Sequence, residues 1–460
     1  MGQFFFIPVS KFQMKTRFAH ILCSFILIFA SIRGVFIYHL GFPSNITYTI
    51  SSLMVLGLGL FSLLSLLSSR LDVPLVLFKN AVILNVILFV YLIFGTLLIA
   101  VGAGVSDSSL LSLFYFFLVF PTVFVFLRFD DKLLTRIVYI ITFITVIGVY
   151  YFFNLGISGG FDAIEAAHST LRPDYFTYSR IGLNLLPFGY TGSHHDTANI
   201  LVMCGIFFLG KFFLCSFGIK KFLLLACYFL ILSALLLTGS AANTLVLLFT
   251  STLSVFFYIQ RSLTAMLISL VFFSFIGIII AGMDFNKSLN LFYVLQKLNP
   301  NTIPDEIFAS LDFDSILNSF VTVLLGFGGV LESPLINSEV GFVNMLSRFG
   351  LFSFAALMFI GFSPIYYLIV FNITSRRCIK FLKLKSLKGL VGDFEQRLRD
   401  QKFRLLMIAM PIITGTLTLI HYGSLFRITS IGLFCVLLTI FLKGYLRAQQ
   451  FIKSESLLHS

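Results

Sequence analysis

The chain contains about twelve apolar runs, each long enough to cross a lipid bilayer as an α-helix. The hydrocarbon core of a bilayer is about 30 Å thick, which about 20 helical residues span. We place the runs at residues 17–40, 46–68, 78–102, 108–127, 134–154, 197–214, 221–238, 241–259, 263–282, 341–371, 404–422 and 427–444. A soluble enzyme is excluded, because 58% of the residues are hydrophobic and only 11% are charged. The sequence therefore predicts an all-α fold, a polytopic transmembrane helical bundle of about twelve spans.

Basic residues are distributed unevenly among the connections between these runs. Alternate connections carry most of the 32 Lys and Arg residues, and the largest group lies in 372–404. Cytoplasmic segments of membrane proteins collect Lys and Arg. Both termini and the basic loop 372–404 are therefore expected in the cytoplasm. The same bias accounts for the net charge of +13, so no nucleic-acid partner is expected.

Two long loops then fall on the outer face, at residues 155–196 and 283–340. Both mix Gly, Pro, Arg, His and acidic residues with aromatic ones, so we expect ordered structure in them. The whole chain, 1–460, is expected to form a single integral membrane domain that includes both loops.

The first long loop ends in a group of cationic and titratable residues, namely Arg172, Arg180, His194, His195 and Asp196. Arginine donates two parallel hydrogen bonds to phosphate oxygens, and a carboxylate can orient a neighbouring histidine for proton transfer. The arginines could instead hold the loop against lipid headgroups, and Asp196 could simply cap the next helix. Both interpretations of the group, an anion site and a structural one, remain open.

A second group of polar residues lies at the outer ends of other spans. Glu339 is expected at the outer mouth of the tenth span, with Arg348 about two turns deeper on the same helix. At 100° per residue the two point to opposite sides of that helix, so they are not direct partners. Arg348 is expected to face a protein interior or a water-filled cavity, or else to snorkel outward. Arg427 and Tyr422 lie between the last two spans, and Arg33 lies in the outer half of the first.

The remaining motifs are weak on their own. The six cysteines lie within spans or on the expected cytoplasmic side, and neither a CxxC nor an HExxH spacing occurs. We therefore expect no disulfide framework, no metal and no cofactor. Residues 235–248 join two spans through a tight turn of small residues, which by itself indicates only a helical hairpin.

Four short motifs follow one another through the middle of the chain. They are Arg180-Ile181-Gly182 with Gly192-Ser193-His194-His195-Asp196-Thr197-Ala198-Asn199, then Leu237-Thr238-Gly239-Ser240, then Leu325-Gly326-Phe327-Gly328 with Ser338-Glu339-Val340-Gly341-Phe342, and finally Arg348-Phe349-Gly350-Leu351. Their order and spacing resemble those of Wzy-type polysaccharide polymerases, in the superfamily that includes the O-antigen ligases. The resemblance covers the region from the fifth to the tenth span.

Two positions depart from the patterns of this superfamily. Ala241 or Ala242 stands where the family often has an arginine, so that basic residue cannot be carried over. The ligase branch typically has Ser-His-Asn at the mouth of the tenth span, where this chain has Glu339 and Val340. The second departure favours polymerase over ligase.

The resemblance implies a GT-C-like fold in a bacterial inner membrane and a metal-independent glycosyltransferase active on the periplasmic face. The expected substrates are glycans linked to undecaprenyl pyrophosphate, and the further expected partners are membrane lipids, a chain-length regulator and a flippase. We assign catalysis to Glu339, His195 and Asp196. Binding of the pyrophosphate and the glycan is assigned to Arg172, Arg180, His194, Arg348, Arg427 and Tyr422.

Two other functions stand as alternatives, namely O-antigen ligation and the flipping or transport of lipid-linked oligosaccharides. A transporter is expected to carry charges deep within several spans and to have helices broken near the midplane. In this chain the polar residues crowd the outer side instead, which favours the polymerase.

Overall fold

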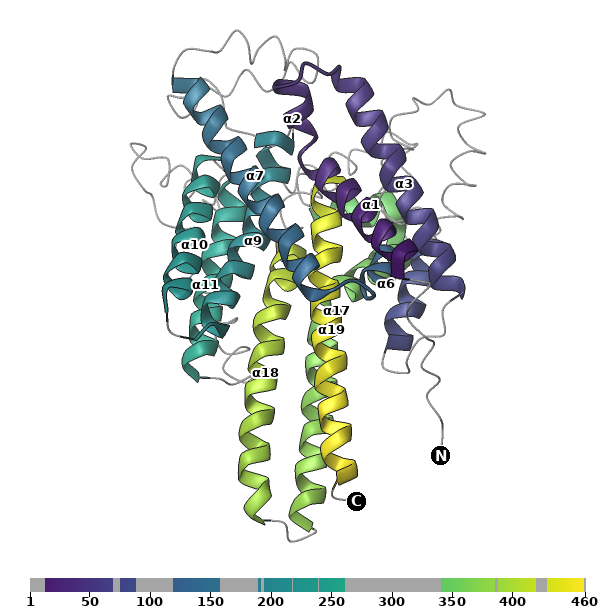
Figure 1. Cartoon of the computed structure of the whole chain (residues 1–460), viewed down its shortest axis with the longest axis vertical. Coiled ribbons are helices and arrows are strands. Elements are labelled where there is room, and N and C mark those ends of the chain that lie inside the picture. The colour runs from purple at the N-terminus through teal and green to yellow at the C-terminus, as the bar shows by residue number, and fades with distance from the viewer. Residues whose placement is uncertain are drawn as a thin grey trace, which may run out of the picture.

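The computed structural model describes residues 13–68, 75–87, 119–157, 189–191, 194–216, 218–238, 240–260, 341–384, 388–418 and 428–458. Within these segments every regular element is a helix (Figure 1). The elements are α1 Gln13–Ser31, α2 Arg33–Tyr38, α3 Ser44–Ser68, α6 Thr122–Phe126, α7 Asp131–Ile157, η4 Gly189–Thr191, α9 His194–Leu214, α10 Ile219–Leu237, α11 Ala241–Gln260, α17 Gly341–Leu384, α18 Lys388–Leu417 and α19 Ile428–Leu458.

Among the described helices, 6 are long and apolar enough to cross a membrane. They are Asp131–Asn154, His195–Leu214, Ile219–Leu237, Ala242–Ile259, Gly350–Phe381 and Ser430–Ser454. Shorter apolar helices match the first three expected spans, at Ile21–Ser31, Thr49–Leu64 and Val76–Ile87. The chain is thus a helical membrane protein. The count of about twelve spans stays a prediction, because 88–118 and 261–340 lie outside the described residues.

Helix α9 lies at the centre of the bundle. It packs against α7, α10, α11, α18 and α19. A Cβ on Gly205 would lie 3.0 Å from Leu247, and one on Gly210 would lie 2.9 Å from the carbonyl oxygen of Met407. Small residues are the usual means of close helix packing in lipid, where burying apolar side chains brings no gain from leaving water. These glycines therefore allow α9 to be enclosed by its neighbours.

Helix α10 lies at the periphery of the bundle and presents an apolar face. Ile219, Phe222, Leu223 and Phe229 are exposed on it, with Ile219 80% exposed. A contiguous apolar surface of this kind marks contact with a membrane. This face therefore fits the acyl chains of the bilayer.

Helices α17, α18 and α19 extend beyond one end of the bundle as a three-helix projection (Figure 1). α17 has 44 residues and α18 has 30, whereas about 20 cross the hydrocarbon core. The range 372–404, expected as a basic loop, is helical on both sides of 385–387, which are not described. Phe394 and Leu398 are buried at helical spacing, and the Phe394 ring packs 5.8 Å from that of Phe451 on α19. This apolar seam stabilises the basic segment as helices.

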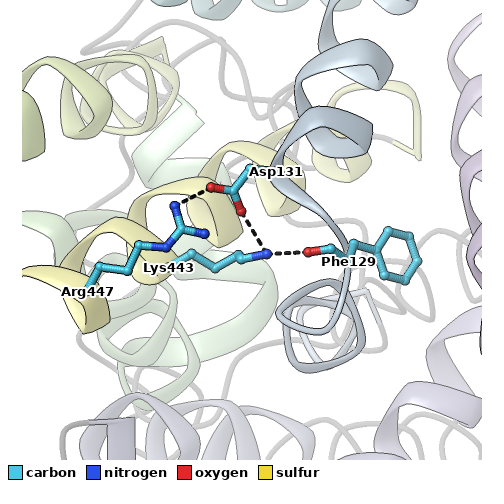
Figure 2. Close-up of polar contacts among 4 residues, drawn as sticks. All are labelled: Phe129, Asp131, Lys443 and Arg447. Atoms are coloured by element: carbon cyan, nitrogen blue, oxygen red, sulfur yellow. Dashed lines mark hydrogen bonds and ion pairs between the residues drawn. The ribbon is translucent and has the colours of Figure 1, made fainter. Parts of the chain in front are cut away.

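An ion cluster joins the base of the projection to α7 (Figure 2). The amine of Lys443 on α19 lies 2.8 Å from a carboxylate oxygen of Asp131, the first residue of α7. Arg447 donates to the other oxygen of Asp131, and Lys443 also donates to the carbonyl oxygen of Phe129. Lys211, near the end of α9, lies within electrostatic range of Asp131. Basic residues from separate connections thus gather at one end of the bundle, which the sequence predicts to be the cytoplasmic end.

Candidate functional site

The structure describes part of the predicted site. His194, His195 and Asp196 form the first turn of α9, and Arg348 lies near the start of α17. The other predicted site residues lie outside the described segments, and their roles stay predictions: Arg172, Arg180, Glu339, Tyr422 and Arg427. The described part of the site therefore centres on the beginning of α9.

Helix α9 begins three residues earlier than the sequence analysis expects. The sequence places the span at 197–214, whereas the helix starts at His194, so the polar run is helical. A carboxylate in the first turn is favourable because it interacts with the free backbone N–H groups and the positive end of the helix dipole. Asp196 is 1% exposed and Asn199, three residues further, is 0% exposed. Polar side chains are therefore buried within an apolar bundle at this end of α9.

A single 3-10 turn, η4, lies close before α9 and packs against α2, α7 and α9. Gly189 has φ +60°, a left-handed conformation that glycine adopts readily, and a Cβ there would lie 3.1 Å from the Thr197 hydroxyl. The hydroxyls of Thr191 and Thr197 share a hydrogen bond of 2.7 Å. η4 is therefore attached directly to the first turns of α9.

The short helix α2 brings two further polar residues to η4. Arg33 is 6% exposed, and its guanidinium donates to the carbonyl oxygen of Thr191 over 3.2 Å. The Nε2 atom of His39 and the hydroxyl of Tyr190 share a hydrogen bond of 2.6 Å. From the sequence, Arg33 is identifiable only as a basic residue in an apolar run, and no pattern in the sequence singles out His39 or Tyr190. Arg33 is the one residue whose position in the sequence could have indicated this group of contacts, because a charged residue in an apolar run usually faces a protein interior.

Aromatic rings surround Tyr190 and connect α2 to α7. The Tyr190 ring lies 5.4 Å from that of His39 and 6.0 Å from that of Phe152. Tyr151 stacks on the same ring at 6.4 Å. Gly148 of α7 leaves the necessary space, since a Cβ there would lie 2.7 Å from the Tyr190 ring. Tyr190 therefore fixes the position of η4 between two helices that are distant in the sequence.

Gly34→Ala is expected to disturb this packing. A Cβ on Gly34 would lie 2.5 Å from the carbonyl oxygen of Tyr190, a backbone atom, so α2 or η4 must move. Overpacking of this kind costs about 1–3 kcal/mol. The matched control is Gly57→Ala on α3, where nothing lies within 4 Å. A lower midpoint of thermal unfolding is expected for Gly34→Ala alone, and equal midpoints would contradict the contact.

The turn between α10 and α11 largely satisfies its own polar groups. The Asn243 amide nitrogen donates to the Ser240 hydroxyl over 3.1 Å, and the Ser240 N–H donates to the Thr238 hydroxyl over 3.4 Å. The expected hairpin is confirmed, with α10 ending at Leu237 and α11 beginning at Ala241. Asn243 is 3% exposed, and its Oδ1 accepts no hydrogen bond from the described residues.

Helix α17 is broken at Gly350. This residue has φ 73° and ψ 171°, a conformation restricted almost entirely to glycine. Arg348 precedes the break, so it lies in the short segment of α17 before Gly350 and not in the long helix after it. The glycine of the Arg348-Phe349-Gly350-Leu351 motif therefore sets the angle between the segment bearing Arg348 and the long apolar helix.

These segments place a buried carboxylate, a buried guanidinium and histidines at the end of the bundle opposite the projection. α7 runs from Asp131, beside the projection, to Phe152, beside η4. A carboxylate with a histidine can accept a proton from a hydroxyl, and a guanidinium can offset a developing negative charge. Within the described segments, no three His, Cys, Asp or Glu side chains are grouped so as to hold a metal ion.

Comparison with models of known protein families gives no match, and comparison with characterised proteins gives none either.

Proposed function

We propose that the chain is a polysaccharide polymerase of the Wzy type, which joins lipid-linked oligosaccharide repeat units at the periplasmic face of a bacterial inner membrane. The donor is a growing glycan on undecaprenyl pyrophosphate. The acceptor is the non-reducing sugar of a new lipid-linked repeat unit. O-antigen ligation and lipid-linked oligosaccharide transport are the competing functions that the experiments below separate from it.

The observation that carries this proposal is the burial of Asp196 in the first turn of the central helix α9. The side chain is 1% exposed in a bundle whose core consists mainly of apolar side chains. A carboxylate at such a position is costly and is usually retained for function. It lies within the motif that resembles the polymerase family, next to His195, and at the same end of the bundle as Arg33. The position therefore supports a reaction that needs a base and a cation at one face of the membrane.

The proposed reaction is the displacement of pyrophosphate by a sugar hydroxyl. The acceptor oxygen forms a bond to the anomeric carbon of the donor, and the bond from that carbon to the pyrophosphate oxygen breaks. The hydroxyl proton passes to a base, for which Asp196, His195 and Glu339 are the candidates. Charge develops on the leaving pyrophosphate, and Arg180, as a positioned cation, offsets it.

Arg180→Lys and Glu339→Gln test this function. Lysine keeps the charge but loses the two-pronged geometry of arginine, and glutamine keeps the shape of glutamate but cannot take a proton. Each variant is expected to lose about 100-fold or more in polymer formation. The measurement is the length distribution of surface polysaccharide in a polymerase-null strain, at matched membrane abundance. Full-length ladders from both variants would refute the proposed site, since a lipid-anchoring role tolerates both changes.

The competing functions give different products in the same strain. Loss of a ligase leaves polymer assembled but not transferred to its final acceptor, whereas loss of a transporter leaves repeat units trapped on the inner leaflet. The polymerase proposal requires that purified protein, supplied with a lipid-linked repeat unit alone, produce a ladder of longer glycans. The ladder is expected to form even when a chelator removes metal ions, because the outer-face segments of the sequence contain no set of metal ligands at a workable spacing.

The topology of the proposal is tested with reporter fusions. Fusions at Gly160 and Asn301 are expected to report the periplasm and a fusion at Lys385 the cytoplasm, because the distribution of Lys and Arg requires it. A cytoplasmic signal at Asn301 would overturn the count of about twelve spans and, with it, the placement of the second loop.

A further inference from the structure

The projection begins at the depth where lipid headgroups lie. The apolar part of α17 ends at about residue 371, and Arg376, Arg377 and Lys380 follow within three turns, as is usual where a helix leaves the hydrocarbon core. The ion cluster of Asp131 with Lys443 and Arg447 lies at the same end of the bundle. The next one to two turns of α17 therefore pass through the layer of phosphates, which is several ångströms thick on each side of the core.

At this depth α17 and α18 bring two cations together. Lys402 is half-buried, and its amine donates to the side-chain oxygen of Asn372 over 3.1 Å. Arg376 lies one turn beyond Asn372 on the same face of α17 and is exposed. Burial lowers the pKa of the Lys402 amine, and the positive charge of Arg376 lowers it further. An anion bound between these cations would offset their repulsion.

The protein supplies no such anion from its described residues. No ion pair there joins a carboxylate to Arg376 or Lys402. Asp400 is two residues from Lys402 on α18, and residues at that spacing do not face each other on a helix. The pair is therefore open to an anion from outside the chain.

An apolar strip leads from the hydrocarbon to this pair of cations. Ile369 is 45% exposed and Ile373 is 46% exposed. With Arg376 they follow the spacing of four and then three residues that places side chains on one face of a helix. An acyl chain can lie along the two isoleucines while the attached headgroup reaches the arginine. A free anion gains nothing from contact with apolar side chains, so the presence of this strip favours a lipid as the ligand.

We propose that Arg376, Lys402 and Asn372 form a binding site for a phosphate group at headgroup depth, which an anionic phospholipid occupies. The guanidinium of Arg376 matches two phosphate oxygens, the Lys402 amine acts as a point charge, and the Asn372 amide adds a hydrogen-bond donor. The site does not depend on the proposed polymerase activity or on which side of the membrane the projection faces.

The test is native mass spectrometry of the purified full-length protein in detergent, titrated with phosphatidylglycerol and separately with phosphatidylcholine. Each basic residue near an anionic surface contributes roughly a factor of five to affinity. Arg376→Gln, at an exposed position, is expected to weaken phosphatidylglycerol binding roughly five-fold, and the double variant Arg376→Gln with Lys402→Gln roughly 30-fold. The matched control, Arg397→Gln with Lys453→Gln, removes the same charge from other exposed positions of the projection.

The outcomes separate the possible sources of the phosphate. Loss of phosphatidylglycerol adducts in the double variant, their retention in the control and weak binding of phosphatidylcholine support the lipid site. Displacement of the adducts by millimolar inorganic phosphate would support the same residues as an anion site but assign it to a soluble phosphate. Equal losses in the two double variants would overturn the proposal, because they would indicate general attraction to the basic projection. Full retention by Arg376→Gln would overturn it as well.

Discussion

Replacing Asp196 with asparagine is expected to abolish polysaccharide formation while leaving the protein folded in the membrane. Asparagine has nearly the shape of aspartate, but it can neither carry a negative charge nor accept a proton. A positioned general base contributes roughly 100- to 10,000-fold to a reaction rate. The interaction of a first-turn carboxylate with the helix dipole contributes only about 0.3–1 kcal/mol to stability. Loss of polymer by at least about 100-fold with a small change in stability is therefore expected.

The measurement is the length distribution of surface polysaccharide in a polymerase-null strain, together with the thermal unfolding midpoint of the purified variant. The matched control is Asp393→Asn, which makes the same chemical change at an exposed position in the projection. If Asp196 only stabilises the start of α9, the two variants give the same ladder and Asp196→Asn differs only in its midpoint. That result would remove Asp196 from the reaction.

Gly350→Ala is expected to have the second large effect, because it acts on the bend in α17. With φ 73° and ψ 171°, Gly350 has a conformation that costs any other residue about 1–3 kcal/mol. Alanine therefore strains the bend or straightens it, and straightening redirects the segment that carries Arg348. A displacement of about 1 Å in a positioning group can reduce a rate about 100-fold. Shortened or absent polymer is expected even where the variant still inserts.

The control for this prediction is Gly392→Ala, in helix α18 of the projection. Nothing lies within 4 Å of a Cβ built on Gly392, so alanine should stabilise the helix by up to about 1 kcal/mol. Both variants are compared by polymer length and by unfolding midpoint at matched abundance. Full-length polymer and an unchanged midpoint from Gly350→Ala would show that neither the strain nor the direction of the Arg348 segment matters.

The sequence by itself determined where several of the described helices lie. The runs at 134–154, 221–238 and 241–259 correspond to α7, α10 and α11 within a few residues at each end. The reason is that the hydrocarbon core imposes a length, and every backbone polar group inside it must be satisfied within the helix. An apolar run of about 20 residues therefore has almost no alternative to a spanning helix.

The sequence predicts less of the structure where the packing of helices against one another decides it. The sequence predicts a loop at 372–404, whereas α17 continues to Leu384 and α18 begins at Lys388, with buried Phe394 of α18 forming an apolar seam with Phe451 of α19. Hydropathy alone cannot show such a seam, since the basic residues on the exposed faces mask it. The beginning of α9 at His194 is not evident from the sequence either, because a polar run at the end of a helix has the composition of a loop.

Only the tertiary structure showed which polar residues meet at the candidate site. Arg33 contacts Thr191 across 158 positions of sequence, and His39 contacts Tyr190 across 151. Neither pair has a local pattern, because each contact depends on how α2, α7 and η4 pack around α9. Gly34 and Gly148 make that packing possible by leaving room for Tyr190. The sequence thus determined the helices, whose formation depends on local composition, whereas the polar contacts required the complete arrangement of helices that brings distant residues together.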